Sequence, residues 1–241
     1  MSTDLTSLRL GDIAVDVVLK DIKNVHLSVY PPTGRVRISA PKRMSVDTIR
    51  VYAISKLDWI KQQQIRLREQ ERETRREYID RESHYVWGRR HLLKVVEEDT
   101  APQVELRPGT MLLRVRPGAS AETRKAVVAG WYRQTLKAAA QPLIEVWERR
   151  LRVEVQRLFV QQMRTKWGSC NTTARSIRLN TELAKKPREC LEYVVLHELV
   201  HLIERRHDER FKQYMDRFMP QWREYRDELN RAPLAHVDWR Y

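Results

Sequence analysis

The sequence has few of the features that mark a secreted or membrane-bound protein. It contains two cysteines, Cys170 and Cys190, which cannot form a disulfide framework and are expected to be free thiols in a reducing compartment. No apolar run approaches the ~20 residues that a membrane-spanning helix needs. The first residues, MSTDLTSLRLGDIAVDVVLK, also lack the pattern of a secretory signal. We therefore expect a cytoplasmic protein with no membrane partner.

Glycine is also scarce, and acidic residues are fewer than basic ones. None of the 7 glycines belongs to a glycine-rich phosphate-binding loop. The 46 basic residues outnumber the 32 acidic ones, and the net charge of +14 favours anionic partners. Residues 101–160 contribute 11 basic and 5 acidic side chains to this excess. Because no nucleic-acid recognition motif accompanies the charge, a basic soluble surface is a simpler interpretation than a DNA-binding groove.

The first half of the chain is predicted to be rich in β-structure. VHLSVY (25–30) and RVRISAP (35–41) alternate apolar and polar residues around a Pro/Gly turn, which indicates a hairpin. Ser45 or Asp47 can then cap a helix with apolar residues at helical spacing. YVWGRRHLLKVVEE and TMLLRVRP each read as one further strand. We expect residues 1–118 to form a β-rich N-terminal subdomain with one long helix.

The second half alternates long helices with short strands. Ser120 is expected to open a long helix, which Pro142 should kink or split. Strands are predicted within 153–163 and at SIRLN, 176–180, followed by a helix from Pro187 and a last amphipathic helix over 208–230. The whole chain is thus expected to be of the α+β class, with residues 119–241 as its second domain.

Within that domain, the stretch YVVLHELVHLIERRHDERF contains the strongest chemical signal. His197 and His201 are four residues apart, so on a helix their side chains stand on the same face. Two neutral imidazoles in this arrangement can bind one face of a zinc tetrahedron, while Glu198 lies beside the metal as a base for a bound water. The alternative is a set of core histidines satisfied by hydrogen bonds, but burying so many polar groups without a shared ion is costly.

His207 is the candidate third ligand, although it lies six residues beyond His201. On a straight helix it would point away from the pair, so the helix must end or turn between Ile203 and His207. No glycine is available for this turn, and we expect a non-glycine residue there to adopt an unusual backbone conformation. Three histidines would leave an open position for water, and Glu198 would take its proton and pass it to the leaving group.

The runs KWGSC (166–170), SIRLNTELAKKP (176–187) and LEYVVLHELVHLIERRHDERF (191–211) resemble the YgjP-like metallopeptidase family, which is related to the SprT proteins within the zincins. The resemblance implies a zincin-like metallopeptidase domain, with His197, His201 and His207 as zinc ligands and Glu198 as the catalytic glutamate. Arg206 stands where relatives commonly have asparagine, and Asp208 where a small residue is usual. Glu204 and Glu209 are the competing third ligands.

Several neighbouring residues have two interpretations. Trp167-Gly168-Ser169-Cys170 is expected to be a tight turn that uses the backbone freedom of Gly168, or a turn that shapes the substrate groove. Cys170 has no evident neighbouring base, which disfavours a nucleophilic role. SIRLN is a candidate exposed strand along which a peptide could lie, or a strand in ordinary sheet pairing. The oxyanion-stabilising residue is open, and the candidates by sequence proximity are Tyr214, Arg164 and Lys166.

These observations predict a zinc metallohydrolase, and we favour a metallopeptidase of the H-E-x-x-H type that acts on peptides or proteins. The first alternative is a zinc-dependent pyrophosphatase acting on nucleoside triphosphates, UTP in particular, since the resemblance also implies that activity and the basic surface is compatible with it. The second alternative is a zinc-binding module recruited to DNA through the basic segment 101–160.

Overall fold

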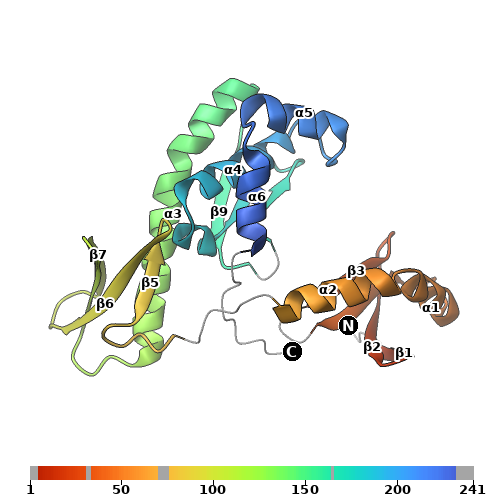
Figure 1. Ribbon diagram of the computed structural model, residues 1–241, viewed down its shortest axis with the longest axis horizontal. Coiled ribbons are helices and arrows are strands. Elements are labelled where there is room, and N and C mark those ends of the chain that lie inside the picture. The colour runs from red at the N-terminus through yellow and green to blue at the C-terminus, as the bar shows by residue number, and fades with distance from the viewer. Residues whose placement is uncertain (1–4, 31–33, 70–75, 164–165, 232–241) are drawn as a thin grey trace. The chain divides into compact units, whose positions relative to one another are not determined.

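The computed structural model of the protein describes residues 5–30, 34–69, 76–163 and 166–231. They form two compact units, one within residues 1–73 and the other within residues 74–235. Figure 1 shows both units, each of which combines helices with β-sheet. The predicted α+β class is therefore confirmed. The predicted domain boundary after residue 118 does not coincide with the division of the compact units and remains a prediction.

The first unit is a four-stranded sheet with two helices on one face. The sheet has the order β1-β2-β4-β3, in which only β2 and β4 are parallel neighbours. Alternate strand residues such as Val15 and Val36 are buried against Ile49 and Ile60 of the helices. The elements are β1 (Leu5–Leu10), β2 (Ile13–Lys20), β3 (His26–Tyr30), β4 (Arg35–Pro41), α1 (Val46–Ser55) and α2 (Leu57–Glu69).

Local sequence signals explain this first unit well. The predicted hairpin is confirmed, because β3 and β4 pair antiparallel. The predicted cap is also confirmed, since the Ser45 hydroxyl accepts a 3.2 Å hydrogen bond from the backbone N–H of Thr48. The expected single helix is instead two, because α1 ends at Ser55 and α2 begins at Leu57.

The second unit contains another four-stranded sheet, of order β5-β6-β8-β7. The prediction of a single strand over YVWGRRHLLKVVEE is wrong, because Trp87 and Gly88 turn the chain back on itself with φ angles of 49° and 76°. Positive φ at both central residues is what a two-residue hairpin turn of type I′ requires. Its strands are β5 (Ser83–Val86), β6 (Arg89–Glu97), β7 (Gln103–Arg107) and β8 (Thr110–Val115).

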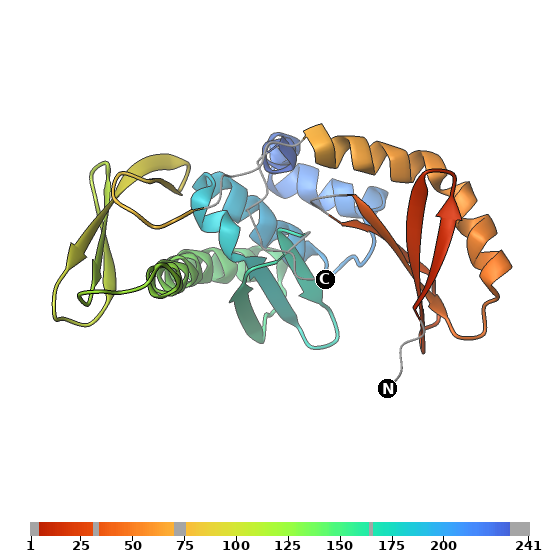
Figure 2. The same ribbon diagram turned by 90° about the horizontal axis from the view of Figure 1, so that it is seen from below.

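This sheet packs on the long helix α3 (Ala121–Leu151), against whose N-terminal end it lies in Figure 2. The Tyr132 hydroxyl of α3 donates to the carbonyl of Tyr85 at 2.8 Å. The Ser120 hydroxyl caps α3 as predicted, accepting from the Thr123 N–H at 3.2 Å. Pro142 does not split the helix, which buries one continuous stripe of side chains along its length.

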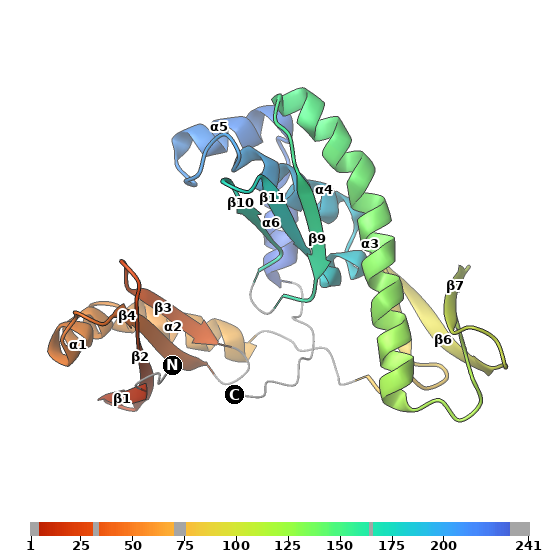
Figure 3. The same ribbon diagram turned by 180° about the vertical axis from the view of Figure 1, so that it is seen from behind.

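A three-stranded sheet lies beside α3 and supports the helix with the histidines. Its order is β10-β11-β9, with β9 next to α3 and β10 at the far edge in Figure 3. The strands are β9 (Arg157–Gln161), β10 (Gly168–Asn171) and β11 (Ser176–Asn180). β11 pairs antiparallel with β10 and parallel with β9. SIRLN is therefore not an exposed edge but the central strand, which confirms the alternative of ordinary sheet pairing.

Four helical segments complete the second unit: η1 (Thr181–Lys185), α4 (Arg188–Val200), α5 (Glu209–Phe218) and α6 (Trp222–Arg231). The predicted single helix over 208–230 is two helices, since the chain is interrupted around Pro220. Proline lacks the N–H that would continue the helical hydrogen bonds. This break lets α5 and α6 both pack against α4, with Phe211 and Trp222 buried in the common core.

Candidate metal centre

His197 lies on helix α4, and His201 is the residue that follows its last turn. The second half of this helix is almost completely buried. Its side chains from Val194 to Val200 are buried, except for His197, which is partly accessible. His197 and His201 are on the same face, and their ring centroids are 4.9 Å apart. The apolar surroundings leave a single polar seam on this helix, as the sequence pattern predicted.

The chain turns sharply after α4 and returns toward it. The last turn tightens, with N–H to carbonyl bonds from Leu202 to Leu199 at 3.0 Å and from Ile203 to Val200 at 2.9 Å. The helix thus ends before His207, as predicted. The prediction of an unusual backbone conformation between Ile203 and His207 is wrong, because the described residues with positive φ lie elsewhere in the chain.

Asp208 fixes the position at which the next helix begins. Its carboxylate caps α5 by accepting the Phe211 N–H at 3.2 Å. Phe211 is 2% exposed, and its ring lies 4.9, 4.9 and 4.7 Å from the ring centroids of His197, His201 and His207. The Phe211 ring therefore contacts all three imidazoles and forms an apolar floor beneath them. No pattern in the sequence predicted this contact.

The three imidazoles converge on one point. One ligand atom from each of His197, His201 and His207 lies within 4.8 Å of the others. The Nε2 atoms of His197 and His207 are 2.9 Å apart. The Nδ1 of His201 lies 3.1 Å from the Glu204 carbonyl, which suits an Nδ1–H donor and leaves Nε2 available as a ligand. The competing carboxylates are directed elsewhere, since Glu204 pairs with Arg210 at 3.8 Å and Glu209 with Lys212 at 3.0 Å.

Burial keeps these imidazoles in the neutral form that a metal ion requires. It lowers the pKa of His197 to about 3, with further lowering from its neighbours His201 and His207. Burial also lowers the pKa values of His201 and His207. The Nδ1 of His197 is buried without a hydrogen-bond partner among the described residues. Three convergent neutral nitrogens in a desolvated setting fit a divalent zinc-type ion, which would offset part of the cost of burying them.

Glu198 is buried beside the histidines and faces β10. Its side chain is 5% exposed, and burial raises the pKa of its carboxyl to about 8, against an opposing influence from Lys166. A Cβ atom added to Gly168 would lie 2.5 Å from Oε1 of Glu198 and 2.8 Å from a methyl carbon of Val194. Gly168 therefore lets the backbone of β10 approach the carboxylate closely.

This geometry corrects the interpretation of the segment around Gly168. The expected tight turn is a strand, and Gly168 has no positive φ. The alternative, that the segment shapes the groove near the metal site, agrees with the structure. Cys170 lies in the same strand, and burial raises the pKa of its thiol to about 11, so it is a poor nucleophile. Both cysteines are free, as expected.

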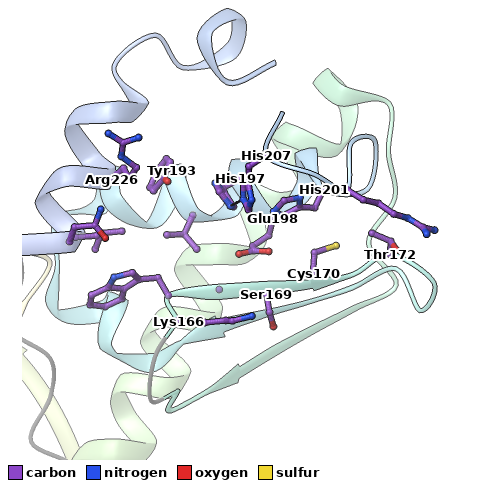
Figure 4. A pocket seen from close by; sticks show the side chains of 16 residues that line it. Lys166, Ser169, Cys170, Thr172, Tyr193, His197, Glu198, His201, His207 and Arg226 are labelled. Atoms are coloured by element: carbon purple, nitrogen blue, oxygen red, sulfur yellow. Dashed lines mark hydrogen bonds between the residues drawn. The ribbon is translucent and has the colours of Figure 1, made fainter. Parts of the chain in front are cut away.

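The histidines and Glu198 open into a pocket of about 550 Å³. Figure 4 shows them between Tyr193 and Arg226 on one side and Thr172 on the other, with β10 below. Of the oxyanion candidates, Lys166 lines the pocket, Tyr214 stacks on Phe218 away from it, and Arg164 lies outside the described residues. The lining residues are Lys166 to Cys170, Thr172, Tyr193, Val194, His197, Glu198, His201, Arg205, His207, Arg226, Leu229 and Asn230.

A family model matches most of the chain. Residues 23–232 match the YgjP-like metallopeptidase domain, a span that includes the whole pocket. The chain belongs to the YgjP-like metallopeptidase family. The resemblance noted from the three sequence runs is thereby confirmed, and membership of this YgjP-like family makes the protein a metallohydrolase of the peptidase type.

Solved structures similar to this YgjP-like chain include two archaeal metallopeptidase zymogens. Jannalysin of Methanocaldococcus jannaschii is 20% identical, with a TM-score of 0.34, and the match covers 37% of this chain and 86% of jannalysin. Abylysin of Pyrococcus abyssi is 18% identical, with a TM-score of 0.36, and the match covers 39% of this chain and 99% of abylysin. No curated protein matches the chain. Among the described residues, no helix has the length and apolar character needed to span a membrane.

Proposed function

We propose that the protein is a zinc-dependent peptidase in which His197, His201 and His207 hold the ion and Glu198 is the general base. The observation that carries this proposal is the convergence of three neutral imidazole nitrogens within 4.8 Å of one another, beside a buried carboxylate. When bound, zinc supplies a Lewis acid that acidifies a water molecule and polarises the scissile carbonyl.

The chain's own groups then handle the proton. Glu198 accepts it from the attacking water and delivers it to the amine leaving group. The pKa of about 8 applies without an ion, and a nearby divalent cation favours the ionised carboxylate that a base requires. Gly168 holds this position open, because any side chain there would displace the carboxylate.

The free edge of β10 is the proposed binding site for the peptide backbone. β10 pairs with β11 on one side only, and within the described residues no strand pairs with its other edge. Gly168, Ser169 and Cys170 of this strand line the pocket. An extended peptide can add to such an edge through main-chain hydrogen bonds, which would place its backbone across the histidines.

The deciding experiment offers the zinc-loaded full-length protein an unstructured protein and a set of quenched fluorescent peptides. We expect cleavage that Glu198→Gln lowers by about 10²- to 10⁴-fold, because this change removes the base but keeps the side-chain volume. Zinc content and thermal unfolding of the variant serve as controls for folding. Equal cleavage by the variant and the native protein would contradict the role of Glu198.

The two alternatives drawn from the sequence can be tested in parallel. Nucleoside triphosphates in the same assay test the pyrophosphatase alternative, and cleavage of triphosphates without cleavage of peptides would overturn the peptidase proposal. DNA binding at low salt that falls steeply as salt is added would indicate the DNA-associated alternative.

A further inference from the structure

The charges that line the pocket are strongly unequal. Cationic side chains come from three separate segments: Lys166 before β10, Arg205 after α4, and Arg226 on α6. Glu198 is the only acidic residue in the lining, and it is buried.

These three cations are available to a ligand. Within the described residues, neither Lys166 nor Arg205 forms a salt bridge, and the one acidic residue of the lining on which Lys166 acts is the buried Glu198. Arg226 contacts its neighbour Asp227 at 2.9 Å, but both side chains are about half exposed. Exposed pairs of this kind contribute little free energy and exchange readily. A concave site with one dominant sign of charge concentrates ligands of the opposite sign.

Arg223, one turn earlier on α6, differs from Arg226 in its relation to the pocket. Its guanidinium binds both carboxylate oxygens of Asp216, with N–O distances of 2.5 and 3.4 Å, and it does not line the pocket. The Trp222 ring lies under both arginines, at 4.5 Å from Arg223 and 5.1 Å from Arg226. Both arginines thus pair with a half-exposed carboxylate, Arg226 through contacts of 2.9 and 3.0 Å to Asp227, but only Arg226 lines the pocket.

The arrangement spreads positive charge along the path proposed for the peptide. In Figure 4, Arg226 and Lys166 lie toward one side of the histidines, above and below β10. Arg205 belongs to the turn between His201 and His207, so it enters the pocket from a different segment. An extended peptide bound along β10 would pass these cations on its way across the metal centre.

We propose that this pocket selects peptide carboxylates, so that the preferred substrates carry an acidic side chain or a free C-terminus close to the scissile bond. This inference rests on the proposed peptidase function and adds its substrate class. Arginine and lysine bind carboxylates through charge-assisted hydrogen bonds, which discriminate strongly against neutral analogues of the same shape.

The test uses matched peptides and the zinc-loaded full-length protein. One pair differs only by Glu against Gln within three residues of the scissile bond, and a second pair differs only by a free against an amidated C-terminus. We expect kcat/KM to be about tenfold higher for the carboxylate member of at least one pair. Because the attraction acts between partly exposed charges, this ratio should fall as salt rises from 0.05 to ~0.5 M. The pair that shows the ratio identifies which carboxylate is recognised.

Substitutions of the three cations test whether the preference for carboxylates arises in this pocket. Arg226→Gln, Lys166→Gln and Arg205→Gln should each lower the carboxylate-to-neutral ratio, and the triple variant should bring it close to one. Arg223→Gln is the matched control on the same helix, and it should keep the native ratio. Arg226→Glu should shift the preference toward a peptide with Lys at the same position.

The outcomes separate this inference from the function on which it rests. If neutral and acidic peptides are cleaved equally by a Glu198-dependent activity, the substrate class is wrong and the peptidase stands. A ratio that survives in the triple variant overturns the assignment to these cations. If no peptide is cleaved by zinc-loaded protein, the peptidase function fails and the inference fails with it.

Discussion

The two compact units differ in what they bury. The core of the first unit is wholly apolar among the described residues, from Leu8 on β1 to Ile60 on α2. All five buried polar or charged residues of the described chain lie in the second unit, and they are His84, His91, Ser176, Asn180 and Glu198. Burying such groups costs stability unless their hydrogen bonds are satisfied. Of the five, Glu198 lines the metal pocket and Asn180 holds the chain beside it, so the candidate site lies in the second unit.

Asn180 shows how one buried polar group organises the site. Its side-chain amide donates to the carbonyls of Met163 at 2.9 Å and Lys166 at 2.8 Å. Its oxygen accepts from the N–H groups of Met163 at 3.3 Å and Glu182 at 3.2 Å. These bonds tie the chain just before β10 to the end of β11.

The largest effect on stability is expected from Asn180→Ala, because it leaves several backbone groups unsatisfied in a buried place. We expect the free energy of unfolding to fall by about 2–4 kcal/mol and peptidase activity to fall with it. Denaturant unfolding and peptide cleavage measure the two. Ser45→Ala, which removes a helix cap in the first unit, should cost about 1 kcal/mol and leave cleavage unchanged. A loss of cleavage in Ser45→Ala as large as that in Asn180→Ala would break the distinction between the units.

Gly168→Ala should have the next largest effect. Its Cβ would meet Glu198 and Val194 at less than 3 Å, so β10 or the carboxylate must move. We expect a loss of about 1–3 kcal/mol in stability and a clear fall in kcat. Gly130→Ala is the control, because a Cβ there meets nothing within 4 Å on helix α3 and should stabilise the protein slightly. Native activity in Gly168→Ala would refute the close approach of β10 to Glu198.

The most gradual of these effects is the pH dependence of the metal-free protein. The folded-state pKa of His197 is about 3, below its ordinary value of 6.5, so the unfolded chain binds more protons between these values. Stability should therefore fall as pH decreases from 6.5 toward 3, with His197 alone contributing ~1.4 kcal/mol per pH unit. Urea unfolding at several pH values measures the slope, and His197→Gln should reduce it. A stability that rises on acidification across this window would contradict the burial of neutral imidazoles.

Local patterns predicted much of the fold. The β3–β4 hairpin, the caps at Ser45 and Ser120, strand β11 and the helix with the H-E-x-x-H motif all follow from alternation, spacing or capping chemistry. These features depend on residues that are close in the sequence, and they could therefore be predicted from local patterns.

The predictions were wrong or incomplete where contacts between residues far apart in the sequence decide the structure. The Trp87-Gly88 turn carries no Asn or Asp signal, and its N–H groups bind the carbonyls of Ala184 and Lys185 in η1. Strand β10 is short, and it exists because β11 pairs with it. The Phe211 floor and the cations Arg205 and Arg226 lie beyond the end of α4, on α5, in the turn after α4 and on α6 respectively. Spacing on one helix revealed His197, Glu198 and His201, but it could not reveal these partners.

The central claim is that His197, His201 and His207 together hold one zinc ion. Metal analysis of the native protein and of the three single alanine variants, after zinc loading and dialysis, tests it most directly. We predict one zinc per native chain and loss of stoichiometric zinc in each variant, with circular dichroism confirming that the variants remain folded. Full zinc retention in folded His197→Ala or His201→Ala, or a native protein that takes up no zinc, would contradict the account.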